Sequence, residues 1–179
     1  MSDLDRLQLL PPAAADLDAL LAFEVDNRAY FESWVTARAP SYYHRDAIAA
    51  AIDQARREHE NDAAHQYLAK LDGQIIGRVN LTAVTRPYFN KAQLGYRIGA
   101  CFGGRGYATR IVALLLEEAF GPLALRRLEA TARPQNLGSL AVMRRNGFHQ
   151  YGKSEQAMLF QGIWSDLLYF ERRNDKDRG

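Results

Sequence analysis

Three closely spaced glycines and an arginine make up the stretch of this sequence that is best suited to hold a ligand. Gly103, Gly104 and Gly106 surround Arg105, and a helical pattern over 107–120 follows directly. Glycine lets a backbone come close to a ligand because it has no Cβ atom. The first N–H groups of a helix lack internal partners, and together with the helix dipole they attract an anion such as phosphate. The alternative is a tight turn that only packs.

The elements on either side of these glycines would hold them in place. Leu94, Tyr96 and Ile98 alternate with other residues, and this two-residue period predicts a half-buried strand. After Gly106, apolar residues recur at helical spacing up to Phe120, which predicts an amphipathic helix. The turn lacks the Gly-Lys-Ser/Thr ending of a P-loop and the G-x-G-x-x-G spacing of dinucleotide-binding folds. These two common nucleotide motifs are therefore excluded.

The same segments resemble the acetyl-CoA signature of the GNAT acetyltransferases. That signature is Leu94-Gly95-Tyr96 followed by the glycine-rich loop over 103–109. Further along, Asn136-Leu137-Gly138-Ser139 and Asn146-Gly147-Phe148 are similar to the branch that acetylates the N-termini of ribosomal proteins (RimJ/RimL-like). The resemblance covers about residues 7–171, and its segments come in the order of the family.

The resemblance implies an acetyl-CoA-dependent N-acetyltransferase that transfers acetyl directly to a primary amine, without a covalent enzyme intermediate. The implied acceptor is the N-terminal α-amine of a protein, and of a ribosomal protein in particular. Two alternatives stay open. One is a small amine such as a polyamine, an amino acid or an antibiotic, and the other is a non-catalytic sensor that binds acyl-CoA.

The resemblance also assigns a set of residues to acetyl-CoA. Backbone N–H groups of the glycine-rich loop would bind the pyrophosphate, and those around residues 98–100 would polarise the thioester carbonyl. Asn136 would meet the pantetheine arm, and Arg145 the ribose 3′-phosphate. In full, the expected cofactor-binding residues are Ile98, Gly99, Ala100, Gly103, Gly104, Arg105, Gly106, Tyr107, Ala108, Thr109, Asn136 and Arg145.

The expected catalytic residues are Ser139, Glu129 and Glu155. The resemblance makes Ser139 the proton donor to the leaving thiolate, although its spacing from Asn136 also fits a simple helix N-cap. Glu129 and Glu155 are candidates for the general base, because Met158 stands where relatives carry an acid. An α-amine has a pKa of about 8 and is partly neutral at pH 7, whereas lysine at about 10.4 needs a stronger base. The weak set of bases therefore favours an α-amine.

Aromatic residues are the candidates for the acceptor site. Tyr30 and Trp34 belong to an aromatic cluster at helical spacing near the N-terminus. Tyr88 stands in a connection between two predicted strands. The resemblance implies that the first helices line the acceptor cleft, whereas packing in the core is the alternative for all three.

The order of elements predicts a mixed α+β domain. Antiparallel strands come first, then strands alternate with helices, and a hairpin ends the pattern. The resemblance implies a mostly antiparallel sheet that is splayed at its centre, with helices on both faces. The 179 residues fit one domain over 1–171, followed by a charged tail over 172–179.

The overall composition sets further bounds. A formal charge of +2 gives no reason to expect nucleic acid, and no apolar run is long enough to cross a bilayer. The single Cys101 excludes an internal disulfide, and a lone cysteine is usually a small buried residue. The four histidines have no ligand spacing with it, so we expect no metal. We expect a cytoplasmic protein without a membrane partner, as a monomer or homodimer.

Overall fold

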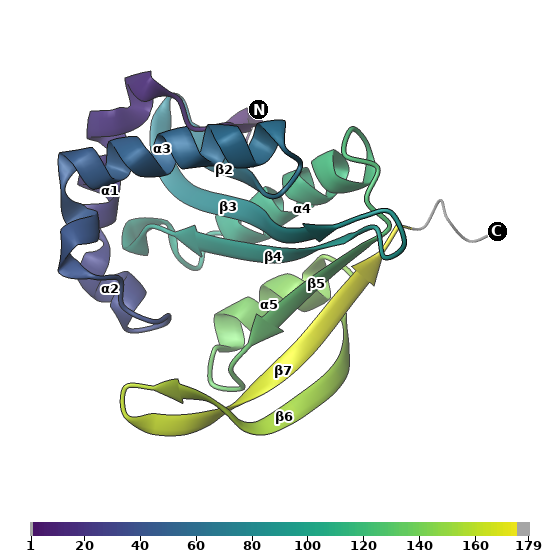
Figure 1. Cartoon of the computed structure of the whole chain (residues 1–179). Coiled ribbons are helices and arrows are strands. Elements are labelled where there is room, and N and C mark those ends of the chain that lie inside the picture. Colours follow the sequence, from purple (N-terminus) through teal and green to yellow (C-terminus); the bar gives the residue numbers. More distant parts are fainter. Residues whose placement is uncertain (1, 175–179) are drawn as a thin grey trace.

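Seven strands form one sheet in the computed structural model of the chain, which describes residues 2–174 (Figure 1). The order across the sheet is β1-β2-β3-β4-β5-β7-β6, and every neighbouring pair is antiparallel except β4 and β5. The strands are β1 (Leu7–Leu10), β2 (His65–Leu71), β3 (Gln74–Thr85), β4 (Lys91–Ile98), β5 (Arg127–Ala132), β6 (His149–Phe160) and β7 (Ile163–Arg173).

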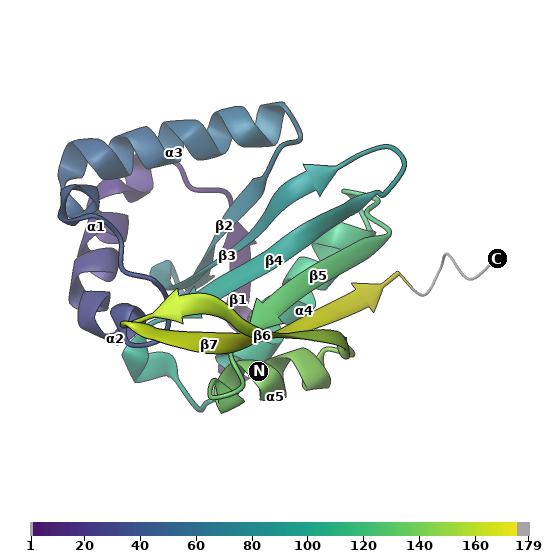
Figure 2. The same ribbon diagram turned by 60° about the horizontal axis from the view of Figure 1, so that its bottom comes forward.

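Helices cover both faces of this sheet (Figures 1 and 2). The α-helices are α1 (Leu17–Asp26), α2 (Arg28–Glu32), α3 (Arg45–Glu60), α4 (Tyr107–Phe120) and α5 (Leu137–Arg145). The short 3₁₀ turns are η1 (Asp3–Arg6), η2 (Ala14–Asp16), η3 (Pro40–Tyr43) and η4 (Ala100–Phe102). The predicted α+β class, with a mostly antiparallel sheet between two layers of helices, is confirmed.

Strands β4 and β5 are paired only where they begin. Their register joins Lys91 to Arg127, Ala92 to Leu128 and Gln93 to Glu129, and no pair follows. Figure 1 shows the two strands diverging beyond this point. The expected splay at the centre of the sheet is therefore present, and the second half of β4 has no strand beside it on that edge.

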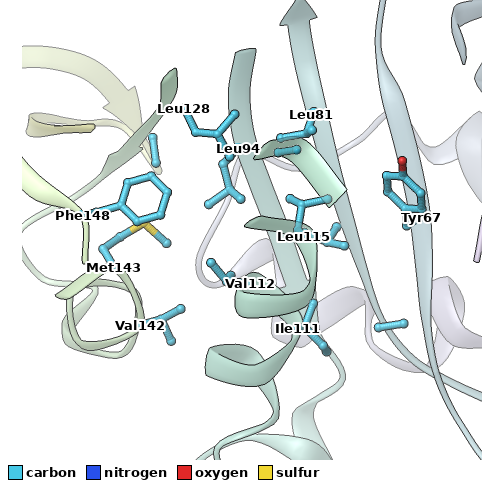
Figure 3. Packing of buried hydrophobic residues seen from close by; sticks show 14 of the residues in the cluster. Tyr67, Leu81, Leu94, Ile111, Val112, Leu115, Leu128, Val142, Met143 and Phe148 are labelled. Carbon is cyan, nitrogen blue, oxygen red and sulfur yellow. The ribbon is translucent and has the colours of Figure 1, made fainter. Parts of the chain in front are cut away.

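The larger core lies between the sheet and helices α4 and α5. Ile111, Val112 and Leu115 of α4 are fully buried and point toward the strands (Figure 3). Met143 of α5 and Phe148 pack near Leu128 in the same cluster (Figure 3). The predicted helical spacing of apolar residues after Gly106 thus corresponds to the face that holds α4 against the sheet.

A smaller core lies on the opposite face, under α1 and α3. It contains Leu20 and Phe23 of α1, Ile48 and Ile52 of α3 and Leu68 of β2. The two cores give each face of the sheet its own layer of helices. Helices therefore lie on both sides of the free edge of β4.

Two predicted boundaries differ from the structure. Asp46 precedes a helical pattern of apolar residues, and the sequence therefore predicts it as the N-cap of that helix. In the structure α3 begins at Arg45 with His44 as its N-cap, and Asp46 lies in the first turn. An acidic residue is favourable in either position because of the helix dipole, so the pattern did not separate them. Strand β7 continues to Arg173, so the predicted tail over 172–179 begins inside a strand, and its residues 175–179 lie outside the described range.

Shortening one buried side chain of α4 should weaken the fold strongly. Leu115→Ala removes a fully buried side chain from the larger core, and we expect a loss of about 2–5 kcal/mol in the free energy of unfolding, measured by urea denaturation. The matched control is Leu137→Ala, because Leu137 is exposed. A loss that is equal for the two variants would contradict this assignment of the core.

Candidate active site

A cavity of about 310 Å³ opens at the splay between β4 and β5. It is bounded by α2, the end of β4, the glycine-rich loop, the start of α4 and the helix α5. Its lining residues are Tyr30, Phe31, Trp34, Val35, Tyr96, Arg97, Ile98, Phe102, Gly103, Gly104, Gly106, Ala108, Thr109, Asn136, Gly138, Ser139, Ala141, Val142 and Arg145. Eight of the twelve expected cofactor residues are in that set.

The glycine-rich loop ends at the head of α4 in a conformation that only glycine adopts readily. Gly104 has a φ of +72° and Gly106, the N-cap of α4, has a φ of +83°. The first helical hydrogen bond runs from the Arg110 N–H to the Gly106 carbonyl, at 3.1 Å. The three N–H groups before it, over residues 107–109, therefore point beyond the helix end. This end of α4 can hold an anion against the cavity.

Two residues of the loop have side chains that do not line the cavity. Tyr107 is buried, and its hydroxyl donates to Asp3 at 3.2 Å. The Arg105 guanidinium lies 3.9 Å from the same carboxylate and stacks on the Tyr107 ring. The structure therefore holds Arg105 by the N-terminal segment, and its contact with a phosphate stays a prediction.

The backbone of β4 offers fewer free donors than the sequence implied. The Gly99 N–H donates to the Ile76 carbonyl at 2.9 Å, and the Ala100 N–H donates to Asn27 Oδ1 at 2.8 Å. In an antiparallel pair successive N–H groups point to opposite sides. The Ile98 N–H therefore points away from β3 and into the splay. Of the three residues expected to polarise a carbonyl, only Ile98 has its donor directed to the cavity.

Ser139 and Tyr96 meet across the cavity. The Tyr96 hydroxyl lies 3.4 Å from Ser139 Oγ, and both residues line the space. Burial raises the pKa of the Tyr96 phenol above its usual value, so the phenol is protonated at neutral pH. The pair is a source of hydroxyl protons inside the splay. The sequence predicted Tyr96 only as a strand residue. Its two-residue spacing from Ile98, which puts both side chains on one face of the strand, is the signal that could have identified it as a site residue.

Asn136 is the N-cap of α5, which confirms the first of its two predicted roles; the second is contact with the pantetheine arm. Its Oδ1 accepts from the Ser139 N–H at 3.1 Å, which fixes the first turn that carries Ser139. At the other end of the helix Asn146 donates to the Thr109 carbonyl at 3.2 Å. Helix α5 is thus tied to the head of α4, and Arg145 lines the cavity beside it. A ligand role for the Asn136 amide is not excluded by the cap, because its Nδ2 is still a donor.

The two predicted carboxylate bases lie elsewhere. Glu129 is 13% exposed and forms ion pairs with Lys91 at 2.8 Å and Arg127 at 2.6 Å, on the open face of β5. Glu155 is 80% exposed on β6 and pairs with Lys153. Neither lines the cavity, and among residues 2–174 no other aspartate or glutamate and no histidine does. The geometry gives no support to either residue as the base.

Of the three acceptor candidates, two line the cavity and one lies far from it. Tyr30 and Trp34 line the cavity from α2 and the turn after it, next to Phe31 and Val35. Tyr88 is 94% exposed in the connection before β4, whereas the cavity lies at the far end of that strand. The geometry does not support an acceptor role for Tyr88. Its place in a loop was the only sequence signal, and a loop can lie at either end of a sheet.

The rim of the cavity is closed by contacts between α2 and the β6–β7 hairpin. Gln161 at the hairpin tip donates to the Glu32 carbonyl at 3.3 Å. Arg133 donates to the Trp34 carbonyl at 3.2 Å and stacks on the Phe160 ring. The lining residues of α2 and the turn after it are therefore held in place by segments that are distant in the sequence.

In residues 2–174 no group of three or more His, Cys, Asp or Glu side chains is placed to hold a metal ion, and none of the helices there is long and apolar enough to cross a membrane. Cys101 is exposed in η4, so the expectation that it is buried is wrong. The turn that follows β4 leaves the core before this residue.

A splayed sheet, an anion-binding helix end at its mouth and hydroxyl groups inside the gap together define a coenzyme A-dependent acyltransferase. The family model for the acetyltransferase (GNAT) domain matches residues 6–149. The chain therefore belongs to the GNAT acetyltransferases, and it is an N-acetyltransferase.

Comparison with known proteins gives the same class over nearly the whole chain. A probable N-acetyltransferase of Bacillus subtilis, YjcK, is 30% identical over 158 residues, which are 87% of each chain. The alanine N-acetyltransferase of ribosomal protein uS5 from Escherichia coli is 26% identical over 90% of this chain and 84% of its own. The structure of Mycobacterium smegmatis RimJ in complex with CoA-disulfide has a TM-score of 0.88 at 24% identity, over 97% of this chain and 84% of that one.

Filling the mouth of the cavity should block the cofactor. Gly103 lines the cavity at a φ of −63°, which any residue adopts, and a Cβ there would lie 3.9 Å from the Tyr30 hydroxyl. We expect Gly103→Trp to weaken CoA binding by at least about tenfold in calorimetry, because the ring occupies the space beside the helix end. Gly103→Ala is the matched control and should lose much less, and similar losses in both would contradict the location of the site.

Proposed function

We propose that this chain transfers the acetyl group of acetyl-CoA directly to the N-terminal α-amine of a protein, with a ribosomal protein as the acceptor. The observation that carries the proposal is the absence of any carboxylate or histidine among the cavity-lining residues. An amine with a pKa of about 8 is partly neutral at pH 7 and needs no strong base, whereas a lysine amine does. The naming of the Escherichia coli relative, an alanine N-acetyltransferase of a ribosomal protein, supports the same acceptor.

The loop and the head of α4 supply the binding energy for the cofactor in this proposal. The N–H groups over 107–109 and the backbone of the glycines receive the pyrophosphate, and Arg145 and Thr109 lie beside it. The free edge of β4 then receives the pantetheine arm, because its N–H groups beyond Gln93 have no strand to pair with on that side. The Ile98 N–H donates to the thioester carbonyl and stabilises the oxyanion that forms there.

The hydroxyl pair completes the reaction. When the neutral amine attacks the carbonyl carbon, the C–S bond breaks and the sulfur leaves as a thiolate. Ser139 donates a proton to that thiolate, and Tyr96, within 3.4 Å of Ser139 Oγ, supports the hydroxyl that gives the proton. The amine loses one proton to solvent, and solvent returns one proton to Ser139, so that the serine hydroxyl is restored at the end of each cycle. Positioning of the two reactants supplies most of the rate, because no covalent intermediate is formed.

The acceptor is tested by following acetylation directly. The purified enzyme, acetyl-CoA and a panel of amines are combined, and released thiol is measured. The panel holds peptides with a free N-terminus, N-blocked peptides with an internal lysine, polyamines and aminoglycosides. We expect turnover only with the free N-terminal peptides, and we expect mass spectrometry of ribosomal proteins to show one acetylated N-terminus that depends on the enzyme.

Other outcomes of that assay decide between the alternatives. Turnover with a polyamine or an aminoglycoside, and none with peptides, would replace a protein acceptor by a small amine. Binding of acetyl-CoA with no thiol release from any amine would favour a sensor. Either result contradicts the proposal.

Removing the Ser139 hydroxyl should separate turnover from cofactor binding. We expect Ser139→Ala to lower kcat by about 10²–10⁴-fold, the range for loss of a general acid, while CoA affinity changes by less than about threefold. Ser154→Ala is the control, because Ser154 lies on β6 outside the cavity lining. A kcat that equals that of the unchanged protein would reduce Ser139 to its place in the α5 cap.

A further inference from the structure

Three arginines surround one buried carboxylate next to the cavity. Glu24 of α1 is fully buried, and its carboxylate lies 2.5 Å from Arg78 of β3, 3.4 Å from Arg38 and 3.6 Å from Arg97 of β4. Tyr42 also donates to it, at 3.4 Å. One negative charge thus lies among three positive charges, so the cluster carries a net positive charge.

Arg97 is the least satisfied member of this cluster. Its only ion pair within residues 2–174 is the 3.6 Å approach to Glu24, and no hydrogen bond from its guanidinium is formed there, whereas Arg78 donates to Glu24, Tyr42 and Gln66. The Arg97 side chain is 22% exposed. Burial and then the nearby charge of Arg38 lower the pKa of its guanidinium. A partly exposed guanidinium with unused donors can still accept an anion from outside the cluster.

Arg97 is one of the residues that line the cavity. Arg97 lines it together with Phe31, over whose ring the guanidinium lies at 5.1 Å, and with Trp34. Because β4 side chains alternate, Arg97 projects to the face of α1 and α2, opposite to Tyr96 and Ser139. The phosphate-binding loop and Ser139 are therefore at one side of the splay, and Arg97 is at the side where an acceptor enters.

We infer that Arg97 binds a carboxylate that the acceptor carries close to its reacting amine. This inference rests on the proposed function and adds the class of acceptor: a protein N-terminus with an acidic group on its first or second residue. A free amino acid carries its own α-carboxylate beside the amine and belongs to the small-amine alternative, which the first test separates from the peptide. The guanidinium fork matches a carboxylate in two parallel hydrogen bonds. The same surplus of positive charge, with no acid in the lining, repels polyamines.

The first test compares acceptors that differ only in charge. One pair of peptides carries Glu or Gln at the second position, and one pair consists of an amino acid and its amide. We expect kcat/KM to be about tenfold to hundredfold higher for the charged member of at least one pair, the range for a hydrogen bond to a charged group. The peptide pair and the amino acid pair separate the two sources of the carboxylate. Equal kcat/KM within both pairs would overturn the inference while leaving the acetyl transfer intact.

The second test asks whether Arg97 is the cause of the preference. In Arg97→Gln the ratio of kcat/KM between charged and neutral members should fall to near one, and Arg97→Lys should recover part of it. Glu24 keeps Arg78 and Arg38 in both variants, so the buried carboxylate stays paired. The matched control is Arg56→Gln on the exposed face of α3, which should keep the full ratio. A ratio that is unchanged in Arg97→Gln would assign the preference to another residue and overturn the inference.

A binding measurement keeps the inference testable if no amine is acetylated. Acetylated peptides with Glu or Gln at the second position are titrated into the CoA-loaded protein by calorimetry, and the same titration is repeated with Arg97→Gln. Tighter binding of the Glu peptide that disappears in the variant would support the carboxylate site even without turnover. Equal binding of the two peptides to the unchanged protein, together with an absence of turnover, would contradict both proposals, and melting curves confirm that each variant is folded.

Discussion

The short parallel contact between β4 and β5 is the constraint on which the rest of this structure depends. After three paired residues the strands separate, so β4 keeps its hydrogen bonds to β3 on one edge and presents unpaired N–H groups on the other. In a continuous sheet those donors would be used by β5. Here they face a cavity that α4 and α5 close from one side and α2 from the other. The cavity therefore lies where β5 would continue the hydrogen bonding of the sheet. A ligand with its own amide groups can accept from the free N–H groups of β4 in place of that strand.

The charges around this gap are arranged unevenly. On the open face of β5, acids and bases are matched: Glu129 lies between Lys91 and Arg127, and Glu171 accepts from Arg127 and His149. Within the gap there is no acid, and the lining cations are Arg97 and Arg145. Such a space favours anionic parts of ligands and the neutral form of an amine, because a positive neighbour disfavours the charged ammonium. The positive charges of the lining thus favour the neutral amine, which is the form that a general base would otherwise have to produce.

The sequence predicted what depends on neighbours along the chain. The glycines of the loop, the spacing of Asn136 and Ser139 and the alternation in β4 each leave a local pattern, and the loop, the N-cap of α5 and the strand lie where these patterns predict them. It did not predict what depends on tertiary pairing. Glu129 has the right chemistry for a base but lies between two cations, and Tyr88 lies at the wrong end of β4. Arg97 appeared only as the polar half of a strand pattern, because Glu24, Arg38 and Arg78 join it from three other segments. The donors of Gly99 and Ala100 were likewise taken by residues far away in the chain.

The rim between α2 and the β6–β7 hairpin has a consequence for how the enzyme can diversify. Gln161 and Arg133 donate to the main-chain carbonyls of Glu32 and Trp34, and not to their side chains. Any residue type supplies a carbonyl, so the side chains at positions 32 and 34 can be exchanged without loss of these two bonds as long as Gln161 and Arg133 are kept. The glycine-rich loop and the head of α4 lie on other elements. Substrate range can therefore drift during evolution, or be redesigned in the laboratory, by mutating these positions alone.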